Sequence, residues 1–253
     1  MPVDQPEVSI IAPALDEEQN LRALVERTSS ALSLANLSFE LLVVLDGGTD
    51  GSLALLERLA EEHSGLGAIQ LAPNSGQHSA VFEGLRYAAG RYVVTIDSDL
   101  QNPPEAIPAV VAVLKTGIEA VGTVRGGRQD SAVRKMASRW FSFSQLALRV
   151  RHVMTDPGCM LRGWSGAVVQ RFLNTSENPW YLPLQLNQHA LSYQELETGH
   201  SARQAGTSRY GAGELARLYV ATLRARVSPG RRRPISPDVI SLHGVLEGQA
   251  RSG

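Results

Sequence analysis

Cysteine, lysine and long apolar runs are all scarce in this chain of 253 residues. Its single cysteine, Cys159, excludes an internal disulfide framework and any metal site built from several cysteines. The longest purely apolar stretches, such as Val110–Leu114, fall far short of the ~20 residues that a membrane-spanning helix needs. No charged-then-apolar signal segment opens the chain. We therefore expect a cytoplasmic protein without a transmembrane segment.

Neither sign of charge is in excess, because 24 basic and 25 acidic side chains give a formal net charge of −1. That balance argues against a general nucleic-acid binder. With 43% hydrophobic and 19% charged residues, the composition also excludes a disordered chain. The length fits one large domain or two small ones, and it suffices to bury a core without disulfides.

Short apolar segments alternate with amphipathic ones along the first 115 residues. The apolar segments predict strands, and the segments with Leu or Val at helical spacing predict helices. This βαβα alternation indicates an α/β fold with a mostly parallel sheet and helices on both faces. The predicted strands are Val8–Ala12, Phe39–Leu45, Ala68–Leu71 and Arg91–Ile96. One helix is predicted to begin near Asp16, and two more are predicted at Ser52–Glu62 and Ser79–Ala89.

Beyond residue 115 the pattern is less regular. We expect a strand at Glu119–Val124, a basic loop over Arg125–Asp130, and a loop at Thr155–Arg162 that leads into a short strand. No internal repeat is present. Further helices are predicted at Ser131–Val150, Ser165–Leu173, Leu182–Ser192 and Gly213–Arg226.

Polar and acidic clusters follow three of the predicted strands directly. They are Pro13–Glu18, Asp46–Asp50 and Asp97–Gln101. Sheets of this kind bind ligands beyond the carboxyl ends of their strands. One such cluster alone would be an ordinary solvated turn, but three at three strand ends favour a functional site.

The pair Asp97 and Asp99 is the strongest candidate for metal binding. Two carboxylates one residue apart can both reach a divalent cation, and Gln101 offers a neutral oxygen nearby. Such hard oxygen ligands select Mg²⁺ or Mn²⁺, which keep open positions for phosphate oxygens. The structural alternative is a polar loop that caps the next helix, whose first turn would contain Pro103–Glu105.

Seven segments in the same order resemble family 2 glycosyltransferases, in the polyprenyl-phosphate sugar transferase branch. That branch includes dolichyl-phosphate mannose synthases and undecaprenyl-phosphate 4-deoxy-4-formamido-arabinose transferases. The resemblance covers roughly residues 7 to 220 and implies a GT-A-type nucleotide-diphospho-sugar transferase fold. The matching segments are APALDEEQN, VVLDGGTDGS, APNSGQHSAVFEGLRYAAG, TIDSDLQNPPEAIP, VGTVRGGRQDSAVRKMAS, DPGCMLR and SARQAGTSRY.

The resemblance implies a donor site for a nucleotide sugar, with UDP as the expected nucleotide. Leu15 stands where the family usually has an aromatic residue, which implies weaker stacking on the base. Asp16 and Leu45 also depart from the family pattern, and His78 is expected to be a structural hydrogen-bonding residue rather than a catalyst. The implied donor-binding residues are Pro13, Leu15, Glu17, Asp46, Asn74, Gly76, Gln77, Asp97, Ser98 and Arg125.

The resemblance assigns the divalent metal to Asp97, Asp99 and Gln101, with Asp99 indispensable for catalysis. The cation neutralises charge that develops on the leaving diphosphate. Arg134 and Ser138 are four residues apart and so share a helical face that is implied to hold an acceptor phosphate. Without the resemblance, this segment reads as a solvated basic helix end. The implied acceptor-binding residues are Arg128, Arg134, Lys135 and Ser138.

Asp156, the first residue of the DPGCMLR segment, has two possible roles. By analogy it is the candidate catalytic base for an alcohol or amine acceptor. A phosphate acceptor is already ionised near neutral pH and needs no strong base. A structural, loop-capping role for Asp156 fits the sequence equally well.

Three functions remain open at this point. The first is metal-dependent, inverting transfer of a hexose or N-acetylhexosamine to a soluble small molecule or a carrier-protein-bound intermediate. The second is transfer to a polyprenyl phosphate at the membrane surface or with a membrane partner, and the third is a non-catalytic nucleotide-sugar-binding subunit. Oligomeric state is left open. We expect a nucleotide-sugar-binding half at 1–115, an acceptor-binding half at 116–226 and a polar tail at 227–253.

Overall fold

The computed structural model describes residues 5–126, 151–175, 179, 181–199 and 238–240. The predicted helices at Ser131–Val150 and Gly213–Arg226 lie outside these residues. The strands are β1 (Val8–Ala14), β2 (Phe39–Asp46), β3 (Leu66–Leu71), β4 (Tyr92–Thr95), β5 (Ala120–Arg125), β6 (Arg162–Ser165), β7 (Tyr193–Thr198) and β8 (Asp238–Ile240). The helices are α1 (Glu18–Leu34), α2 (Ser52–Ala60), α3 (Gln77–Tyr87), a 3₁₀ turn η1 (Pro104–Ala106), α4 (Ile107–Lys115), α6 (Gly166–Leu173) and α7 (Leu182–His189).

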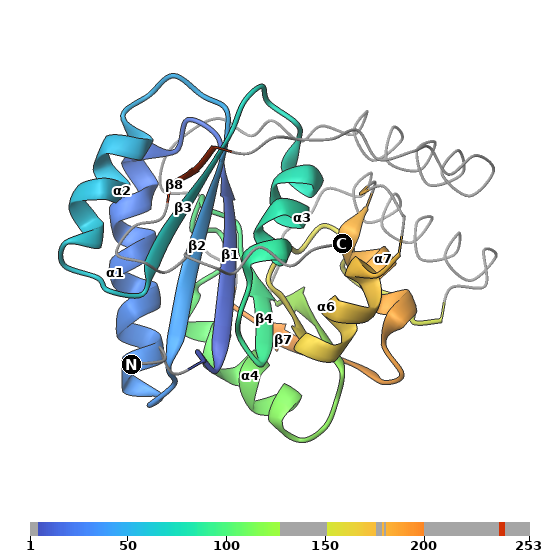
Figure 1. Cartoon of the computed structure of the whole chain (residues 1–253). Coiled ribbons are helices and arrows are strands. Elements are labelled where there is room, and N and C mark those ends of the chain that lie inside the picture. Colours follow the sequence, from blue (N-terminus) through green and yellow to red (C-terminus); the bar gives the residue numbers. More distant parts are fainter. Residues whose placement is uncertain (1–4, 127–150, 176–178, 180, 200–237, 241–253) are drawn as a thin grey trace.

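One eight-stranded sheet runs through the described part of the chain, in the order β7-β5-β6-β4-β1-β2-β3-β8. Strand β1 pairs in parallel with both β2 and β4, and β2 pairs in parallel with β3. Helices α1, α2 and α3 make the crossovers between these strands (Figure 1). The sequence prediction of a mostly parallel sheet is therefore confirmed.

The antiparallel strand β6 brings a further loop to the carboxyl edge of the parallel strands. It pairs antiparallel with both β4 and β5, and β5 pairs in parallel with β7. The amino end of β6 consequently lies at the same edge as the carboxyl ends of β4 and β5. The loops that follow β1, β2, β4 and β5 and the loop that precedes β6 all meet there.

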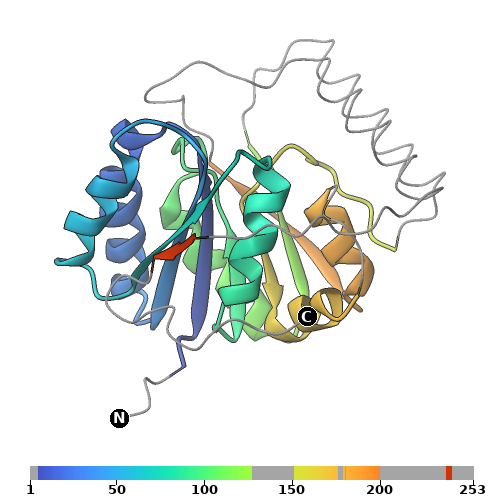
Figure 2. The same cartoon turned by 45° about the horizontal axis from the view of Figure 1, so that its top comes forward.

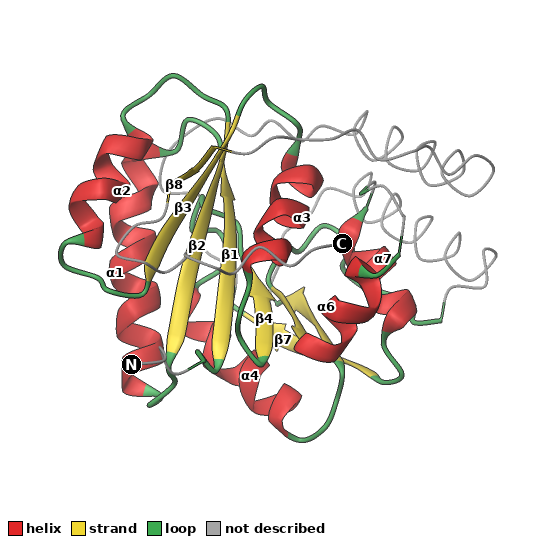
Figure 3. Ribbon diagram, viewed as in Figure 1, coloured by secondary structure: helices red, strands yellow, loops and turns green. Residues whose placement is uncertain are grey.

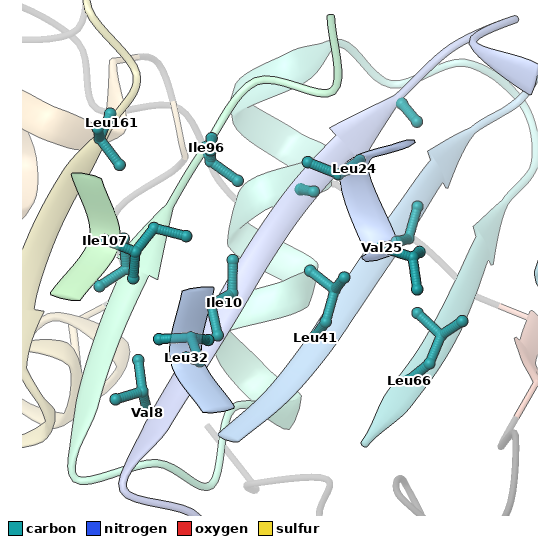
Figure 4. Close-up of a cluster of buried hydrophobic side chains, with 14 of the residues drawn as sticks. Val8, Ile10, Leu24, Val25, Leu32, Leu41, Leu66, Ile96, Ile107 and Leu161 are labelled. Atoms are coloured by element: carbon teal, nitrogen blue, oxygen red, sulfur yellow. The ribbon is translucent and has the colours of Figure 1, made fainter. Parts of the chain in front are cut away.

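Helices cover both faces of the sheet, so its central strands are buried and mostly apolar. Side chains of β1 and β2 pack on one face with those of α1, α2 and α4. Figure 4 shows Ile10, Leu24 and Leu41 in this layer. On the other face, Ile11 and its neighbours pack with α3, α6 and α7, and Figures 2 and 3 show these helices against the strands.

Helix α3 lies very close to the sheet at Gly84. A Cβ atom at this position would come within 2.6 Å of the Ile11 side chain. Only glycine therefore allows α3 to sit at this depth. The close approach also fixes the amino end of α3, where Gln77 begins the helix beyond the strand ends.

Most predicted elements are present with their bounds shifted by a few residues, but two strands were not predicted. Strand β7 reads YQELET, so it contains no continuous apolar run and is mostly half-exposed at the end of the sheet. Strand β8 is only three residues long, and it lies within the segment predicted as a polar tail. The division into two halves near residue 115 stays a prediction. No helix among the described residues is long and apolar enough to cross a membrane.

His78 links α3 to the residue that precedes α7. Its ring lies edge-on to the ring of Tyr181, with 5.2 Å between the centroids. Burial lowers the pKa of His78 to about 4. Its Nδ1 atom is buried and has no hydrogen-bond partner among the described residues. The contact seen here is ring packing, without a hydrogen bond at Nδ1 among the described residues, and the structural role of His78 stays a prediction.

We expect the pH dependence of stability to report the neutral state of His78. An unfolded histidine takes up a proton near pH 6.5, whereas native His78 does so only near pH 4. Its contribution is therefore fully present above pH 6.5 and is lost as the pH falls, by about 1 kcal/mol per pH unit. His78→Phe keeps a ring against Tyr181 and should flatten the decline. Urea unfolding at pH 7, 6 and 5 measures this.

The matched control is His63→Asn, at a histidine on the loop between α2 and β3. This variant should keep the wild-type slope. An unchanged slope in His78→Phe would show that His78 is not the residue responsible.

Candidate active site at the carboxyl edge of the sheet

Asp97 and Asp99 lie on the loop directly after β4. The Nε2 atom of Gln77, at the start of α3, donates a hydrogen bond of 2.8 Å to Asp97 Oδ1. Asn102 donates a longer one, of 3.4 Å, to Oδ2. Asp99 accepts from the backbone N–H of Gln101 at 3.1 Å and from its side-chain Nε2 at 2.9 Å. Both carboxylates are half-buried, so they are held in place yet open to a ligand.

The predicted metal residues Asp97, Asp99 and Gln101 thus occupy one short loop. Gln101 turns its amide nitrogen toward Asp99, which leaves the amide oxygen as its acceptor atom. Among the described residues, no group of three or more His, Cys, Asp and Glu side chains gathers to hold a metal ion. A set of two carboxylates and one amide oxygen suits Mg²⁺ or Mn²⁺, since these ions keep several positions for water and phosphate oxygens.

Arg125, the last residue of β5, forms a two-point ion pair with Asp156. Its Nε lies 2.7 Å from Asp156 Oδ2, and its Nη2 lies 2.8 Å from Oδ1. Each side chain is only 10% exposed. Burial alone would lower the pKa of Arg125, but the hydrogen bonds and charge of Asp156, with further contributions that include the charge of Asp97, outweigh it and raise that pKa. The guanidinium of Arg125 is therefore held by Asp156 at the same sheet edge as Asp97.

The ion pair accounts for both oxygens of Asp156. The sequence left two roles open for this residue, a catalytic base or a structural one. The geometry places Asp156 as the partner of Arg125, from the loop that precedes β6. A role as base stays a prediction.

The loops after β1, β2 and β3 are tied together by carboxylates. Asp46, buried at the end of β2, accepts hydrogen bonds from the backbone N–H groups of Ser75 at 2.7 Å and Gly76 at 2.8 Å. Asp16 accepts from the N–H of Thr49 at 3.0 Å. Asp46 was predicted to contact the nucleotide. In the structure both of its oxygens hold the loop that carries Asn74 and Gly76.

The loop between β2 and α2 is further fixed by Asp50. Its carboxylate accepts from the N–H groups of Glu18 at 3.0 Å and Ser52 at 3.1 Å. Partial burial raises the pKa of Asp50, but these hydrogen bonds outweigh it and lower the pKa overall. In return, Glu18 accepts from the N–H of Gly51 at 3.0 Å. The two loops that frame the predicted nucleotide site are therefore rigid before any ligand binds.

Some of the other predicted site residues lie at the carboxyl edge of the sheet, and the rest lie outside the described residues. Pro13 is buried within β1, whereas Leu15 and Glu17 follow that strand and are half-buried. Ser98 is buried between the two metal-site carboxylates. All of these lie at the same sheet edge. The predicted acceptor residues Arg128, Arg134, Lys135 and Ser138 lie outside the described residues.

Three residues near the site were not predicted. Asn102 is buried between Asp97 and the Cys159 thiol, which donates to Asn102 Oδ1 at 3.2 Å. Arg162 is fully buried, and Tyr181 donates from its hydroxyl to the carbonyl of Pro157. An arginine that ends the apolar run CML was a visible signal for Arg162. Tyr181 had none, because it lies far away in the sequence.

Comparisons with known proteins agree with this geometry. Residues 9–174 match the model of the glycosyl transferase family 2. The undecaprenyl-phosphate 4-deoxy-4-formamido-L-arabinose transferase of Yersinia enterocolitica is 38% identical over 94% of this chain and 73% of its own length. The enzyme of the same name from Yersinia pestis strain Pestoides F is 39% identical over 83% of this chain and 64% of its own length.

Solved structures show the same fold at low sequence identity. Glucosyl-3-phosphoglycerate synthase from Mycobacterium tuberculosis, in complex with Mn²⁺, UDP-glucose and phosphoglyceric acid, has a TM-score of 0.62 and 19% identity, over 89% of this chain and 81% of its own. Mannosyl-3-phosphoglycerate synthase from Rubrobacter xylanophilus has a TM-score of 0.61 and 17% identity, over 90% and 78%. The fold is of the GT-A type, and the chain belongs to family 2 of the glycosyltransferases.

Proposed function

We propose that this protein transfers a sugar from a nucleotide diphospho-sugar, with UDP as the expected nucleotide, to a polyprenyl phosphate. The observation that carries the proposal is the grouping of Asp97 and Asp99 with the fixed charge of Arg125 at one sheet edge. A carboxylate pair and a guanidinium together suit a metal-bound diphosphate. A neighbour of the same fold was solved with Mn²⁺ and UDP-glucose, which supports this choice of donor.

The lipid acceptor replaces the soluble acceptor that the sequence analysis put first. Relatives that are 38–39% identical are named as undecaprenyl-phosphate transferases, and they support the second of the three sequence-based readings. The protein would then work at a membrane surface. The identity of the donated sugar stays open.

The reaction we propose is a single in-line displacement. A phosphate oxygen of the acceptor attacks the anomeric carbon, the bond from that carbon to the diphosphate breaks, and its electron pair leaves with the nucleoside diphosphate. The configuration at the anomeric carbon is inverted. Such an acceptor is already ionised and needs no strong base, so Asp156 can remain paired with Arg125 throughout.

The chain's own residues have separate tasks in this scheme. Asp97, Asp99 and Gln101 would hold the divalent cation, which supplies positive charge to the leaving diphosphate when bound. Arg125 could donate further hydrogen bonds to the diphosphate, because its ion pair with Asp156 uses two of its five N–H groups and already fixes its position. The tied loops after β1, β2 and β3 hold the nucleoside.

Asp99→Ala should abolish turnover while the fold is retained. Asp99 accepts hydrogen bonds from the backbone and side chain of Gln101, two residues along the same loop, so the substitution removes a metal ligand and leaves the strands of the sheet untouched. We expect turnover to fall by about two orders of magnitude or more, as the loss of several kcal/mol of charge stabilisation implies. Calorimetric titration with UDP and UDP-sugars, in Mn²⁺ and in EDTA, should show metal-dependent binding in the wild type that the variant lacks.

The matched control for Asp99→Ala is Glu105→Gln, an exposed carboxylate six residues away that pairs with Arg27. It should bind and turn over as the wild type does. Near-normal turnover of Asp99→Ala, with circular dichroism unchanged in both variants, would contradict the metal assignment.

The acceptor is tested by offering the purified full chain undecaprenyl phosphate in vesicles and, separately, soluble phosphates and alcohols. We expect a sugar-linked lipid product. Arg134→Ala should raise the KM for the lipid phosphate about tenfold by removing a charge-assisted contact. Lys115→Ala is the matched control, since Lys115 pairs with Glu7 at the opposite edge of the sheet. Transfer to a soluble acceptor alone, or an unchanged KM in Arg134→Ala, would favour the soluble-acceptor reading.

A further inference from the structure

The loop from Asp156 to Leu161, here called the Asp156 loop, is held through its backbone carbonyls by buried side chains. Arg162 donates from Nη2 to the carbonyl of Asp156 at 2.5 Å and from Nε to the carbonyl of Cys159 at 2.8 Å. The hydroxyl of Tyr181 donates to the carbonyl of Pro157. The hydroxyls of Thr95 and Thr123 donate to the carbonyls of Met160 at 2.6 Å and Leu161 at 2.7 Å. Five of the six carbonyls are thus bound by side chains from β4, β5, β6 and the residue before α7. This loop has one conformation imposed from several elements.

Arg162 is an unusual residue for the interior of a sheet. Its side chain is 1% exposed, and its buried Nη1 atom has no hydrogen-bond partner among the described residues. A buried charge is costly unless hydrogen bonds compensate it, and an apolar residue would pack here more favourably. The guanidinium instead binds two carbonyls of the Asp156 loop. The two hydrogen bonds indicate that Arg162 serves the geometry of that loop rather than the stability of the fold.

The Asp156 loop in turn encloses the side chain of Arg125. The carboxylate of Asp156 accepts two hydrogen bonds from Arg125. On the backbone of the loop, a Cβ atom at Gly158 would lie 3.0 Å from Arg125 Nη2. A larger residue here would therefore press on the guanidinium and shift it by a few tenths of an ångström. Without such a cradle, Arg125 would lose rotamer freedom on binding a ligand, which would weaken the binding.

We propose that Arg162 and Tyr181 are positioning residues that act through the Asp156 loop to fix the Arg125 guanidinium at the carboxyl edge of the sheet, where it meets the donor diphosphate. The inference rests on the proposed function for the diphosphate. Neither residue touches the donor. They make the site complementary to a diphosphate before binding, so that none of the binding free energy is lost in ordering Arg125.

The test measures the affinity of the full chain for UDP in the presence of Mn²⁺ by calorimetric titration. Tyr181→Phe removes only the hydroxyl that holds Pro157, and we expect it to weaken binding about fivefold. Arg162→Met, which removes two hydrogen bonds to the loop, should weaken binding about tenfold or more. Gly158→Ala, at an exposed position, should also weaken binding by pressing on Arg125. Gly158→Ala therefore still tests the positioning of Arg125 if Arg162→Met fails to fold.

A double-mutant cycle with Arg125→Met separates positioning from general stability. In the Arg125→Met background, Tyr181→Phe should change affinity by less than about twofold, because the group that it positions is gone. The matched control is Trp164→Phe on β6, which loses a buried hydrogen bond of 2.8 Å to Asn187 and should leave UDP affinity unchanged.

Each outcome decides one claim. Wild-type affinity in both Tyr181→Phe and Gly158→Ala would overturn the positioning role, as would an equal effect of Tyr181→Phe with and without Arg125. Failure of the wild type to bind UDP or GDP with Mn²⁺ would instead contradict the donor half of the proposed function, and it would remove the basis of this inference.

Discussion

The parallel pairing of β1 with both β2 and β4 is the constraint on which the site depends. Parallel strands place their carboxyl ends at one edge, so loops from distant parts of the chain meet without any further device. Glycine at position 84 lets α3 lie close to β1, and Gln77 then reaches Asp97. The antiparallel β6 adds the loop of Asp156 to the same edge. The directions of the strands thus bring the site residues together at one edge of the sheet.

Gathering acidic residues at one edge creates repulsion that the structure resolves in three ways. Asp46 accepts hydrogen bonds from backbone N–H groups, Asp156 forms an ion pair with Arg125, and Asp97 and Asp99 accept from side-chain amides. Backbone dipoles and a guanidinium satisfy the first two carboxylates within the protein. Amides carry no net charge, so the pair at 97 and 99 keeps its negative charge. A divalent cation is the natural complement of that remaining charge.

Sequence patterns predicted those parts of the molecule that depend on local periodicity. Apolar runs located β1 to β4, and the polar residues after them located Asp46, Asp97 and Asp99 correctly at one edge. Strand β7 was missed because most of its residues are polar and its two apolar residues do not alternate with them, so its place in the sheet comes only from pairing with β5. The Arg125–Asp156 pair was missed for a related reason. Its members are 31 residues apart, and nothing local in the sequence couples them.

The same ion pair bears on the nature of the acceptor. A neutral acceptor must lose a proton during transfer, which calls for a carboxylate with an oxygen available to take it. Asp156 is the carboxylate best placed by family analogy, yet the guanidinium of Arg125 engages both of its oxygens, and buried side chains fix the loop that carries it. A phosphate acceptor makes no such demand. The pairing of Asp156 is therefore consistent with the phosphate acceptor proposed above, which the names of the relatives support separately.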